Sequence, residues 1–561
     1  MLSIPRTYVA FSYRPTPTVS KQSSKLICNA RLISLNHFKQ TAMAAGFKPR
    51  VEVNEPDLLK TTQQACEEQA KAKLHQLLHP RSAPILSSDG ALLPKRAFDS
   101  LSSTSTHLSP GEIIQRVIPD ITKATQTLTS SHHERYWRHI PSWKDVPEEV
   151  WLSHKWQLRN DIKGEKRLKA FLHEVLPVSI PPSITDTCCL KHIKTAQDFI
   201  TEVELGIKHA SMTIRLTPHM LSIINWANPL NDPILRQCIP LKSRLLPNHP
   251  KLTLDSLHET EDSPVGGLVH RYPDKVLFLS TDVCPFYCSY CTRSYAIGTN
   301  TDLVKKVSFK PTLDRWKDMI LYIANNPQVQ DVVVSGGDTY ILTSDQIQWI
   351  GEQLLQIPHI KRFRFATKGL AVSPCRILDP TDAWAEEIIR LTWKGRALGK
   401  AVAVHTHFNH PSEFTWINRV AAQRLFASGV VLRNQSVLLK GVNDNVATMS
   451  HLIRELADNN IQPYYVYQHD MVKHVEHLRT PLQTILDLET QIRGSIAGFM
   501  MPNFVVDLPG GGGKRLASSY KSYDPLTGIS TFVAPAVSGR GKEDRIYEYY
   551  DPIPNSDPAV S

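Results

Sequence analysis

The sequence has no long apolar run. No uninterrupted apolar stretch in its 561 residues approaches the roughly 18 residues that a membrane-spanning helix needs. Apolar residues still make up 41% of the chain, which is ordinary for a globular protein and enough to bury a sizeable core. We therefore expect a soluble protein with no membrane partner.

Acidic residues are absent from the first fifty positions, which contain eight Lys or Arg, and the first acid is Glu52. This segment accounts for most of the net charge of +11 and leaves +3 for the rest of the chain. The charge therefore does not indicate a nucleic-acid partner. A basic segment rich in Ser and Thr is typical of a mitochondrial transit peptide. Residues 1–50 are predicted to direct the protein to the mitochondrion; the alternative is a disordered basic tail on a cytoplasmic protein.

Cysteine is sparse, and its distribution excludes a disulfide scaffold. The nine cysteines are odd in number and mostly scattered, as in proteins of a reducing compartment. Three of them cluster, namely Cys284, Cys288 and Cys291. No fourth cysteine lies nearby, and none follows Cys375.

The chain changes character along its length. Residues 51–135 form a variable region and a Ser/Thr/Pro-rich linker. Residues 136–262 have a helical pattern with Pro-rich breaks and several Trp, which predicts a cap or an oligomerisation layer, the latter in a homo-oligomer. Between residues 263 and 514 short β-branched runs alternate with helical periods. Residues 515–561 form a short C-terminal tail.

Six strands are expected in the alternating region. They span residues 276–283, 331–335, 361–366, 400–405, 430–437 and 461–467. Helical segments between them imply parallel β/α units with right-handed crossovers. The predicted fold class is therefore α/β, a partial (β/α)6 barrel with an N-terminal helical region.

Capping residues predict where three of the helices begin and end. Thr343 and Gln346 are placed as a capping box for a helix over residues 343–357. A second helix is expected from a Ser412 cap to a Gly429 stop. A third is expected from near Asn443 to near Asn460.

Unusual residues fall where the predicted strands end. They are the cysteines after the first strand, Gly336-Gly337-Asp338 after the second, His405 and His407 after the fourth, Asn434 and Gln435 at the fifth, and His469 and Asp470 after the sixth. Active sites of such barrels lie at the carboxyl ends of the strands. We therefore expect these side chains to share one site.

The cysteine cluster has the spacing C-x3-C-x2-C in a loop directly after a strand. Thiolates suit iron–sulfur clusters or zinc, but a structural zinc site needs four ligands. Three thiolates on a four-iron cluster leave one iron open. With Tyr290 before the last cysteine, the motif resembles that of the radical S-adenosylmethionine (SAM) superfamily. The resemblance implies a [4Fe–4S] cluster on Cys284, Cys288 and Cys291, with SAM on the fourth iron.

A second motif places four glycines before Lys514. A phosphate-binding G-x4-G-K-[ST] loop would need Gly at 508 and Ser or Thr at 515, whereas the chain has Leu508 and Arg515. Lys514 is instead expected on a bare loop, where a lysine can form a Schiff base with an aldehyde cofactor.

Together the motifs resemble the lysine 2,3-aminomutase family, from about Ser142 to about Lys514. The strings that carry the resemblance include Trp143-Lys-Asp, His270-Arg-Tyr-Pro-Asp274, Ser335-Gly-Gly-Asp338, Thr406-His-Phe-Asn-His-Pro411 and the run from Val505 to Lys514. The family combines SAM radical chemistry with pyridoxal phosphate (PLP). The resemblance therefore implies a radical SAM barrel and an isomerase that converts L-lysine to β-lysine, fed by an electron donor that the sequence does not identify.

The resemblance also implies roles for individual residues. PLP is expected on Lys514, with Arg271, Tyr272 and Lys275 as phosphate contacts. SAM is expected to contact Tyr290, Gly336, Gly337, Asp338, His407 and Gln435. The substrate is expected to bind Arg293 through its carboxylate, and Asp470 and Asp507 through its side-chain ammonium. A buried ammonium needs carboxylate partners, so the two acids favour lysine. Two rivals stay open, an aminomutase for another amino acid and a non-catalytic iron–sulfur or zinc protein.

Three features qualify the resemblance. Lys275 stands where the family usually has Arg, so a bidentate fork becomes a point charge. Some members hold a structural zinc through one mid-barrel Cys and three near the C-terminus; here Asn445 takes the mid-barrel place, so structural zinc is not expected. His405, His407 and His410 form an alternative metal-binding set.

Overall fold

A computed structural model describes residues 135–535, 537 and 541–552. The predictions for residues 1–50 and for the linker up to residue 134 lie outside this range. Within it, no helix combines the length and the apolar character needed to cross a membrane.

The centre of the fold is one sheet of nine strands in the order β11-β10-β9-β8-β7-β6-β5-β4-β3. The strands are β3 (Leu268–Tyr272), β4 (Lys275–Thr281), β5 (Asp331–Gly336), β6 (Arg362–Ala366), β7 (Ala401–Thr406), β8 (Val431–Val437), β9 (Ile461–Tyr467), β10 (Asn503–Leu508) and β11 (Gly513–Leu516). Strands β4 to β10 run parallel, and β3 and β11 pair antiparallel at the two ends. The predicted α/β barrel is confirmed, and the sheet adds a seventh parallel strand and an antiparallel strand at each end.

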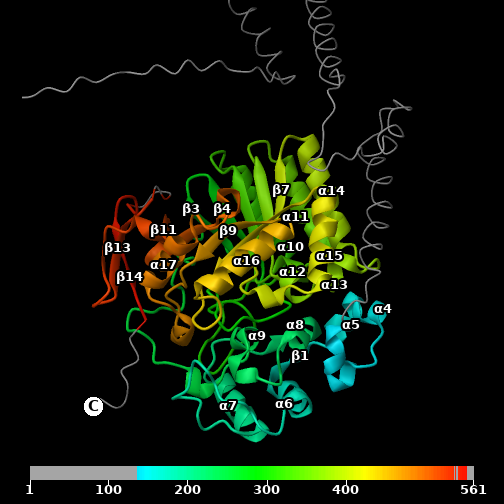
Figure 1. The fold of residues 1–561 in the computed structure, drawn as a ribbon. Coiled ribbons are helices and arrows are strands. Elements are labelled where there is room, and N and C mark those ends of the chain that lie inside the picture. The colour runs from blue at the N-terminus through cyan, green and yellow to red at the C-terminus, as the bar shows by residue number, and fades with distance from the viewer. Residues whose placement is uncertain (1–134, 536, 538–540, 553–561) are drawn as a thin grey trace, which may run out of the picture. The chain divides into compact units, whose positions relative to one another are not determined.

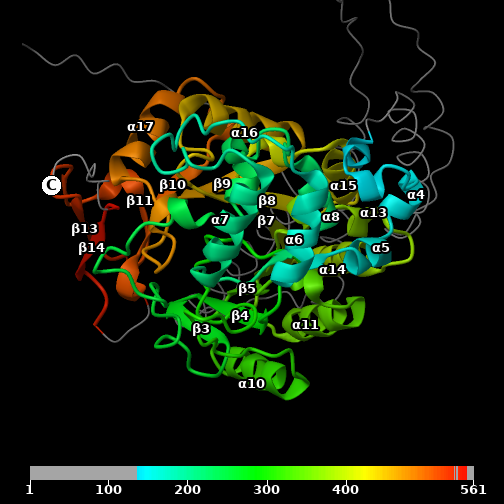
Figure 2. The same cartoon turned by 90° about the horizontal axis from the view of Figure 1, so that it is seen from below.

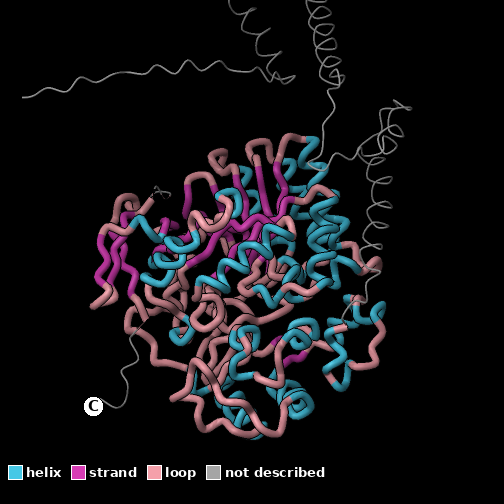
Figure 3. Tube along the Cα trace, viewed as in Figure 1, coloured by secondary structure: helices cyan, strands magenta, loops and turns pink. Residues whose placement is uncertain are grey.

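Helices cover the outside of this sheet. They are α10 (Leu313–Ala324), α11 (Ser344–Gln356), α12 (Gly369–Val372), α13 (Cys375–Leu378), α14 (Trp384–Ala397), α15 (Trp416–Ala427), α16 (Val446–Asp458) and α17 (Leu482–Ile492). In Figures 1 and 2 the strands follow an arc from β3 to β11, with α10, α11 and α14 to α17 on its outer side. Figure 3 separates the central strands from the helices around them. Because β3 and β11 do not pair with each other, the barrel is partial.

Local capping sets the helix starts. The capping box of Thr343 and Gln346 is present as predicted. The next helix does not start from Ser412, because Pro411–Glu413 forms a separate short turn (η8) and Thr415 caps α15. The third predicted helix, expected from near Asn443, is α16, which Asn445 caps by accepting a hydrogen bond from the Thr448 amide.

The regular elements before the barrel are mostly short helices. Its elements are η3 (Tyr136–His139), η4 (Pro141–Trp143), α4 (Glu148–Trp151), α5 (His154–Arg159), β1 (Ile162–Lys163), α6 (Gly164–Val175), α7 (Ala196–Lys208), β2 (Arg215–Leu216), α8 (Pro218–Ile223), η5 (Pro229–Asn231), α9 (Pro233–Arg236) and η6 (Lys242–Arg244). The rings of Trp137 and Trp151 stack with centroids 4.7 Å apart. One continuous hydrophobic core joins this region to the barrel.

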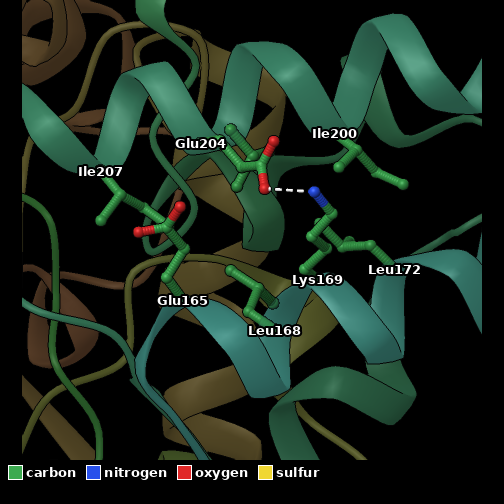
Figure 4. A pocket seen from close by; sticks show the side chains of 8 residues that line it. Glu165, Leu168, Lys169, Leu172, Ile200, Glu204 and Ile207 are labelled. Atoms are coloured by element: carbon green, nitrogen blue, oxygen red, sulfur yellow. Dashed lines mark hydrogen bonds and ion pairs between the residues drawn. The ribbon is translucent and has the colours of Figure 1, made fainter.

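Helices α6 and α7 pack directly against each other (Figure 4). Leu168 and Leu172 face Ile200 in the contact, and Lys169 bridges to Glu204 at 2.6 Å. The space between them does not admit a water molecule. This contact is therefore packing and not a ligand site.

The C-terminal segment folds into a separate three-stranded sheet instead of forming only a tail. Its antiparallel strands are β12 (Ser522–Asp524), β13 (Ile529–Val533) and β14 (Ile546–Tyr550). Strand β14 contacts β10 and the turn after it, and the sheet lies beside β11 in Figures 1 and 2. Residues beyond 514 therefore border the end of the barrel.

Candidate active site at the carboxyl ends of the strands

The three clustered cysteines lie in the loop after β4, as predicted. All are free and partly exposed at the surface of the loop. Burial of the thiol groups raises the pKa of Cys284 and of Cys291, and raises that of Cys288 to about 11. Such thiols become thiolates only beside a strongly positive partner.

Three thiols on one loop are the ligand type that iron–sulfur clusters use. Among the described residues, no three His, Cys, Asp or Glu side chains are arranged to hold one metal ion. Cys284, Cys288 and Cys291 are the candidate ligands of a cluster here.

The glycine pair after β5 packs directly on the chain that leads into the cysteine loop. Gly337 donates its amide to the Thr281 carbonyl at 2.5 Å, and Asp338 donates its amide to the Val283 carbonyl at 2.9 Å. A Cβ at Gly336 would lie 2.3 Å from the Thr281 oxygen, and one at Gly337 would lie 2.4 Å from the Val283 oxygen. Only glycine permits this approach.

The Asp338 carboxylate is held by backbone amides of two loops. It accepts from the Tyr340 and Lys368 amides, each at 2.8 Å. Burial raises its pKa to about 6, against these hydrogen bonds. Asp338 thus ties the loop after β5 to the loop after β6, next to the cysteine loop.

Tyr290 and His407 belong to one buried polar network. The Tyr290 hydroxyl lies 2.9 Å from His407 Nε2 and 3.3 Å from Gln237 Oε1, and it accepts from the Asn409 side chain at 2.7 Å. Burial lowers the pKa of His407 to about 3, so its ring is neutral at pH 7. Gln237 and Asn409 were not predicted; Asn409 stands inside the motif after β7, whereas Gln237 gives no signal in the sequence.

Gln435 serves a second network. Its side chain lies 2.9 Å from His405 Nδ1 and accepts from the Tyr467 hydroxyl at 3.1 Å. His407 meets the Gln435 carbonyl through Nδ1, while His410 Nδ1 accepts from the Ser412 amide. The three histidines therefore point to separate partners, and the alternative metal set is not formed in the described part of the chain.

The glycine run forms a turn between two paired strands. Gly510, Gly511 and Gly513 have φ of 73°, 80° and 80°, which side chains rarely adopt. Lys514 lies on β11 and not on a bare loop, because it pairs across the hairpin with Asp507 of β10. Its Nζ is 2.5 Å from Asp507 Oδ2. Burial alone would lower the Lys514 pKa, but Asp507 raises it well above its ordinary value.

Arg271, Tyr272 and Lys275 gather around Lys514. The Tyr272 hydroxyl accepts from the Lys514 amide at 3.1 Å, and Lys275 Nζ lies 3.8 Å from the Tyr272 ring centroid. Arg271 donates to Asp262 at 2.8 Å and lies 4.0 Å from Asp507. Burial lowers the pKa of Lys275 to about 8. This cation-rich, glycine-lined place fits an anionic aldehyde cofactor.

One edge of the Arg293 guanidinium group is ion-paired with Glu259. Its Nε and Nη2 each lie 2.7 Å from the two carboxylate oxygens of Glu259, which also accepts from the Tyr295 hydroxyl at 3.0 Å. Glu259 was not predicted, although it lies in the acidic run that precedes β3. The ion pair fixes the guanidinium plane and turns its remaining Nη1 edge away from Glu259.

Asp470 and Asp507 each have one carboxylate oxygen that accepts no hydrogen bond in the described part of the chain, and that of Asp507 lies 4.0 Å from Arg271 Nη1. Asp470 accepts from the Thr292 hydroxyl at 2.6 Å through Oδ2, and Oδ1 of both acids is buried without a hydrogen-bond partner among the described residues. Burial, followed by the Asp507 charge, raises the pKa of Asp470 to about 7. The structure brings these two acids into electrostatic contact, which sequence separation alone does not reveal.

A partial barrel of parallel strands with a three-cysteine loop after its first parallel strand defines a radical SAM enzyme. Comparison with known proteins agrees at the level of sequence. The chain is 37% identical to an L-lysine 2,3-aminomutase of Clostridium subterminale over 67% of its own length and 80% of that protein. It is 35% identical to the L-lysine 2,3-aminomutase of Bacillus subtilis over 68% of its length and 72% of that protein. The chain belongs to the lysine 2,3-aminomutase family and is an aminomutase, an isomerase acting on an amino acid.

Other comparisons add less. A glutamate 2,3-aminomutase of Clostridioides difficile is 32% identical over 65% of this chain and 76% of that protein. Among solved structures, Streptococcus suis SuiB bound to precursor peptide SuiA has a TM-score of 0.31 and 13% identity, covering 43% of this chain and 49% of that one. That likeness is too low to support an argument. No family model matches the chain.

The predicted mitochondrial destination is wrong. The relatives come from organisms without mitochondria, such as Bacillus subtilis and Methanococcus maripaludis. A basic composition rich in Ser and Thr is shared by transit peptides and by other basic segments, so the composition of residues 1–50 does not identify a targeting signal.

Proposed function

We propose that this aminomutase converts L-lysine to β-lysine by moving an amino group between neighbouring carbons, with a [4Fe–4S] cluster, SAM and PLP as cofactors. The observation that carries the choice of substrate is the pair Asp470 and Asp507. Two interacting carboxylates, each with a buried oxygen that accepts no hydrogen bond from the described residues, match the side-chain ammonium of lysine. They would repel the carboxylate of glutamate.

Cys284, Cys288 and Cys291 would hold the cluster, and its open iron would take SAM. When bound, this pair supplies a carbon-centred radical that abstracts hydrogen. Gly336 and Gly337 keep the cysteine loop against β5 by their close backbone contacts. Asp338, Tyr290, His407 and Gln435 would line the SAM side, where the His407 ring is neutral and is held through its two nitrogens by the Tyr290 hydroxyl and the Gln435 carbonyl.

Lys514 would hold PLP, which when bound supplies an electron-delocalising ring for the migrating nitrogen. Tyr272 places the Lys514 backbone through its hydroxyl. Arg271 and Lys275 provide positive charge for the cofactor's phosphate. The hairpin of β10 and β11 keeps Lys514 opposite Asp507, so cofactor attachment and substrate binding involve neighbouring side chains.

The α-carboxylate of the substrate would meet Arg293. Glu259 occupies the Nε and Nη2 edge, so the substrate would bind the Nη1 edge. Asp507 is paired with Lys514 through Oδ2, and Asp470 with Thr292. Asp470 Oδ1 accepts no hydrogen bond among the described residues and is the first acceptor for the substrate ammonium. Asp507 Oδ1, which lies 4.0 Å from Arg271 Nη1 and also accepts no hydrogen bond from the described residues, is the second.

The test is turnover by the purified protein, reconstituted without oxygen and given SAM, PLP, a strong reductant and L-lysine. β-Lysine should form, and glutamate should not react. Lys514→Ala should lower turnover by at least about 100-fold, whereas Lys440→Ala at an exposed position should leave it unchanged. Turnover of a different amino acid in place of lysine would refute the substrate, and zinc without iron or sulfide would refute the cluster.

A further inference from the structure

The C-terminal segment lies against the glycine turn that precedes Lys514. A Cβ added at Gly513 would lie 2.9 Å from Val537, and one at Gly512 would lie 2.8 Å from the Tyr547 ring. Val537 is buried, and Tyr547 belongs to β14. Residues far beyond the last family motif therefore cover the place where the cofactor would bind.

Lys542 is the charged residue by which this segment reaches the site. Its Nζ lies 2.5 Å from Asp262 Oδ1, and its side chain is 13% exposed. A Cβ on Gly511 would lie 2.7 Å from the same Nζ. Lys542 thus lies directly over the glycine turn, beside Asp262, the carboxylate that Arg271 also binds.

Asp262 joins Lys542 to the predicted cofactor residues. It binds Lys542 through Oδ1 and Arg271 through Oδ2, the latter at 2.8 Å. One carboxylate therefore holds two cations side by side. Such an arrangement brings both cationic heads within reach of one polyoxygen anion.

Four cationic side chains gather around the glycine turn, namely Arg271, Lys275, Lys514 and Lys542. Asp262 and Asp507 are ion-paired with Arg271, Lys514 and Lys542, and Glu259 and Asp331 act on Arg271 and Lys275 from further away. A phosphate monoester carries about −1.5 to −2 charges at neutral pH, so a place with several cationic heads suits it.

We propose that Lys542, supplied by the C-terminal segment, is a binding residue for the phosphate of the aldehyde cofactor. This inference rests on the proposed function and adds a contact beyond the family motifs. Lys275 offers a point charge where an arginine would offer a fork. Lys542 supplies a second lysine point charge from another part of the chain, in addition to Arg271 and Lys275.

Equilibrium binding of PLP and of pyridoxal, which lacks the phosphate, tests the proposal on the full-length protein. Absorbance of the bound aldehyde gives both dissociation constants. Lys542→Gln should weaken PLP binding by roughly tenfold and leave pyridoxal binding unchanged. Lys542→Arg should restore most of the PLP affinity. Lys521→Gln, at an exposed lysine of the same segment, should change neither.

Two results would overturn the proposal. If Lys542→Gln binds PLP as tightly as the unsubstituted protein does, Lys542 does not contact the phosphate. Equal losses for PLP and pyridoxal would show that it only fastens the segment. Where Lys542→Gln lowers the yield of folded protein, Lys542→Met keeps the apolar stem and must give the same selective loss. Unchanged PLP binding in Lys514→Ala would instead contradict the proposed function.

Discussion

At the scale of single residues, the site depends on charges that the fold buries at a cost. Asp470 is the clearest case, because it has one hydrogen bond to Thr292 and an acid, Asp507, nearby. The cation that acts on Asp470, Lys514, is paired with Asp507, and a carboxylate without an ion-pair partner of its own is destabilising in such a place. Its presence is understandable if a substrate ammonium completes the site, since functional sites often retain such strain.

The substitution Asp470→Asn should therefore stabilise the unliganded protein and weaken lysine binding. The pKa of Asp470 is about 7 in the folded protein against an ordinary 3.8. A raised carboxyl pKa gives stability that is full below pH 4 and is lost as the pH rises to 7. The gain from Asn should thus be absent at pH 4 and reach a few degrees in melting temperature at pH 8.

Thermal unfolding between pH 4 and 8 measures this difference. The matched control is Asp318→Asn on the exposed face of α10, which should show no such pH-dependent gain. A lower melting temperature for Asp470→Asn at pH 8 would contradict the account of Asp470 as a destabilised acid.

At the scale of elements, the site depends on how closely the strand ends approach the loops. Strand β5 ends in two glycines that lie on the backbone leading to Cys284. The hairpin of β10 and β11 positions Lys514 by pairing its backbone with that of Asp507. In both cases backbone packing, more than side-chain chemistry, sets the position of a reactive residue.

Gly337→Ala should disturb the cysteine loop. The new methyl group would lie 2.4 Å from the Val283 carbonyl oxygen, and a backbone atom cannot move aside as a flexible side chain does. We expect a loss of about 1–3 kcal/mol in the free energy of unfolding and a lower iron content after reconstitution. Chemical denaturation and iron analysis measure both.

Gly498→Ala provides the comparison, because an added Cβ at Gly498 would meet nothing within 4 Å. This variant should keep its iron content and change stability only slightly. If Gly337→Ala matches Gly498→Ala in iron content and stability, close backbone packing does not require glycine at position 337.

At the scale of the whole molecule, the helical region and the barrel form one site and one core. Residue Gln237 of the first region reaches the Tyr290 hydroxyl, and Glu259 binds Arg293. The His154 amide donates to Asp379 at 2.7 Å, and the Thr217 hydroxyl donates to the Val372 carbonyl. The hydrophobic core is continuous between the two regions.

A fragment beginning at residue 263 should therefore fail to fold. It would expose the apolar face that the helical region covers and leave Arg293 buried without Glu259. We expect aggregation and no cooperative unfolding by circular dichroism, in contrast to the full chain. A soluble fragment with a sharp thermal transition would show that the barrel is independent of the helical region.

Local rules explain which features the sequence predicts. The six strands were found because buried parallel strands are nearly all apolar, and the Thr343 capping box because its residues lie three apart. The start of α15 was misplaced because Ser412 and Thr415 are both acceptable caps and only the turn at Pro411 decides between them. The C-terminal sheet was missed because its strands are short and its pairing depends on distant neighbours.

The sequence alone predicts the chemistry that we propose. The spacing of Cys284, Cys288 and Cys291 and the glycine run before Lys514 are local patterns whose chemistry follows from residue type. The tertiary structure alone decided the partners of these residues. Glu259 on Arg293, Gln237 at Tyr290 and Lys542 over the glycine turn come from segments far apart in the chain. Their contacts arise because the parallel sheet gathers the strand ends at one edge, and no local spacing records that arrangement.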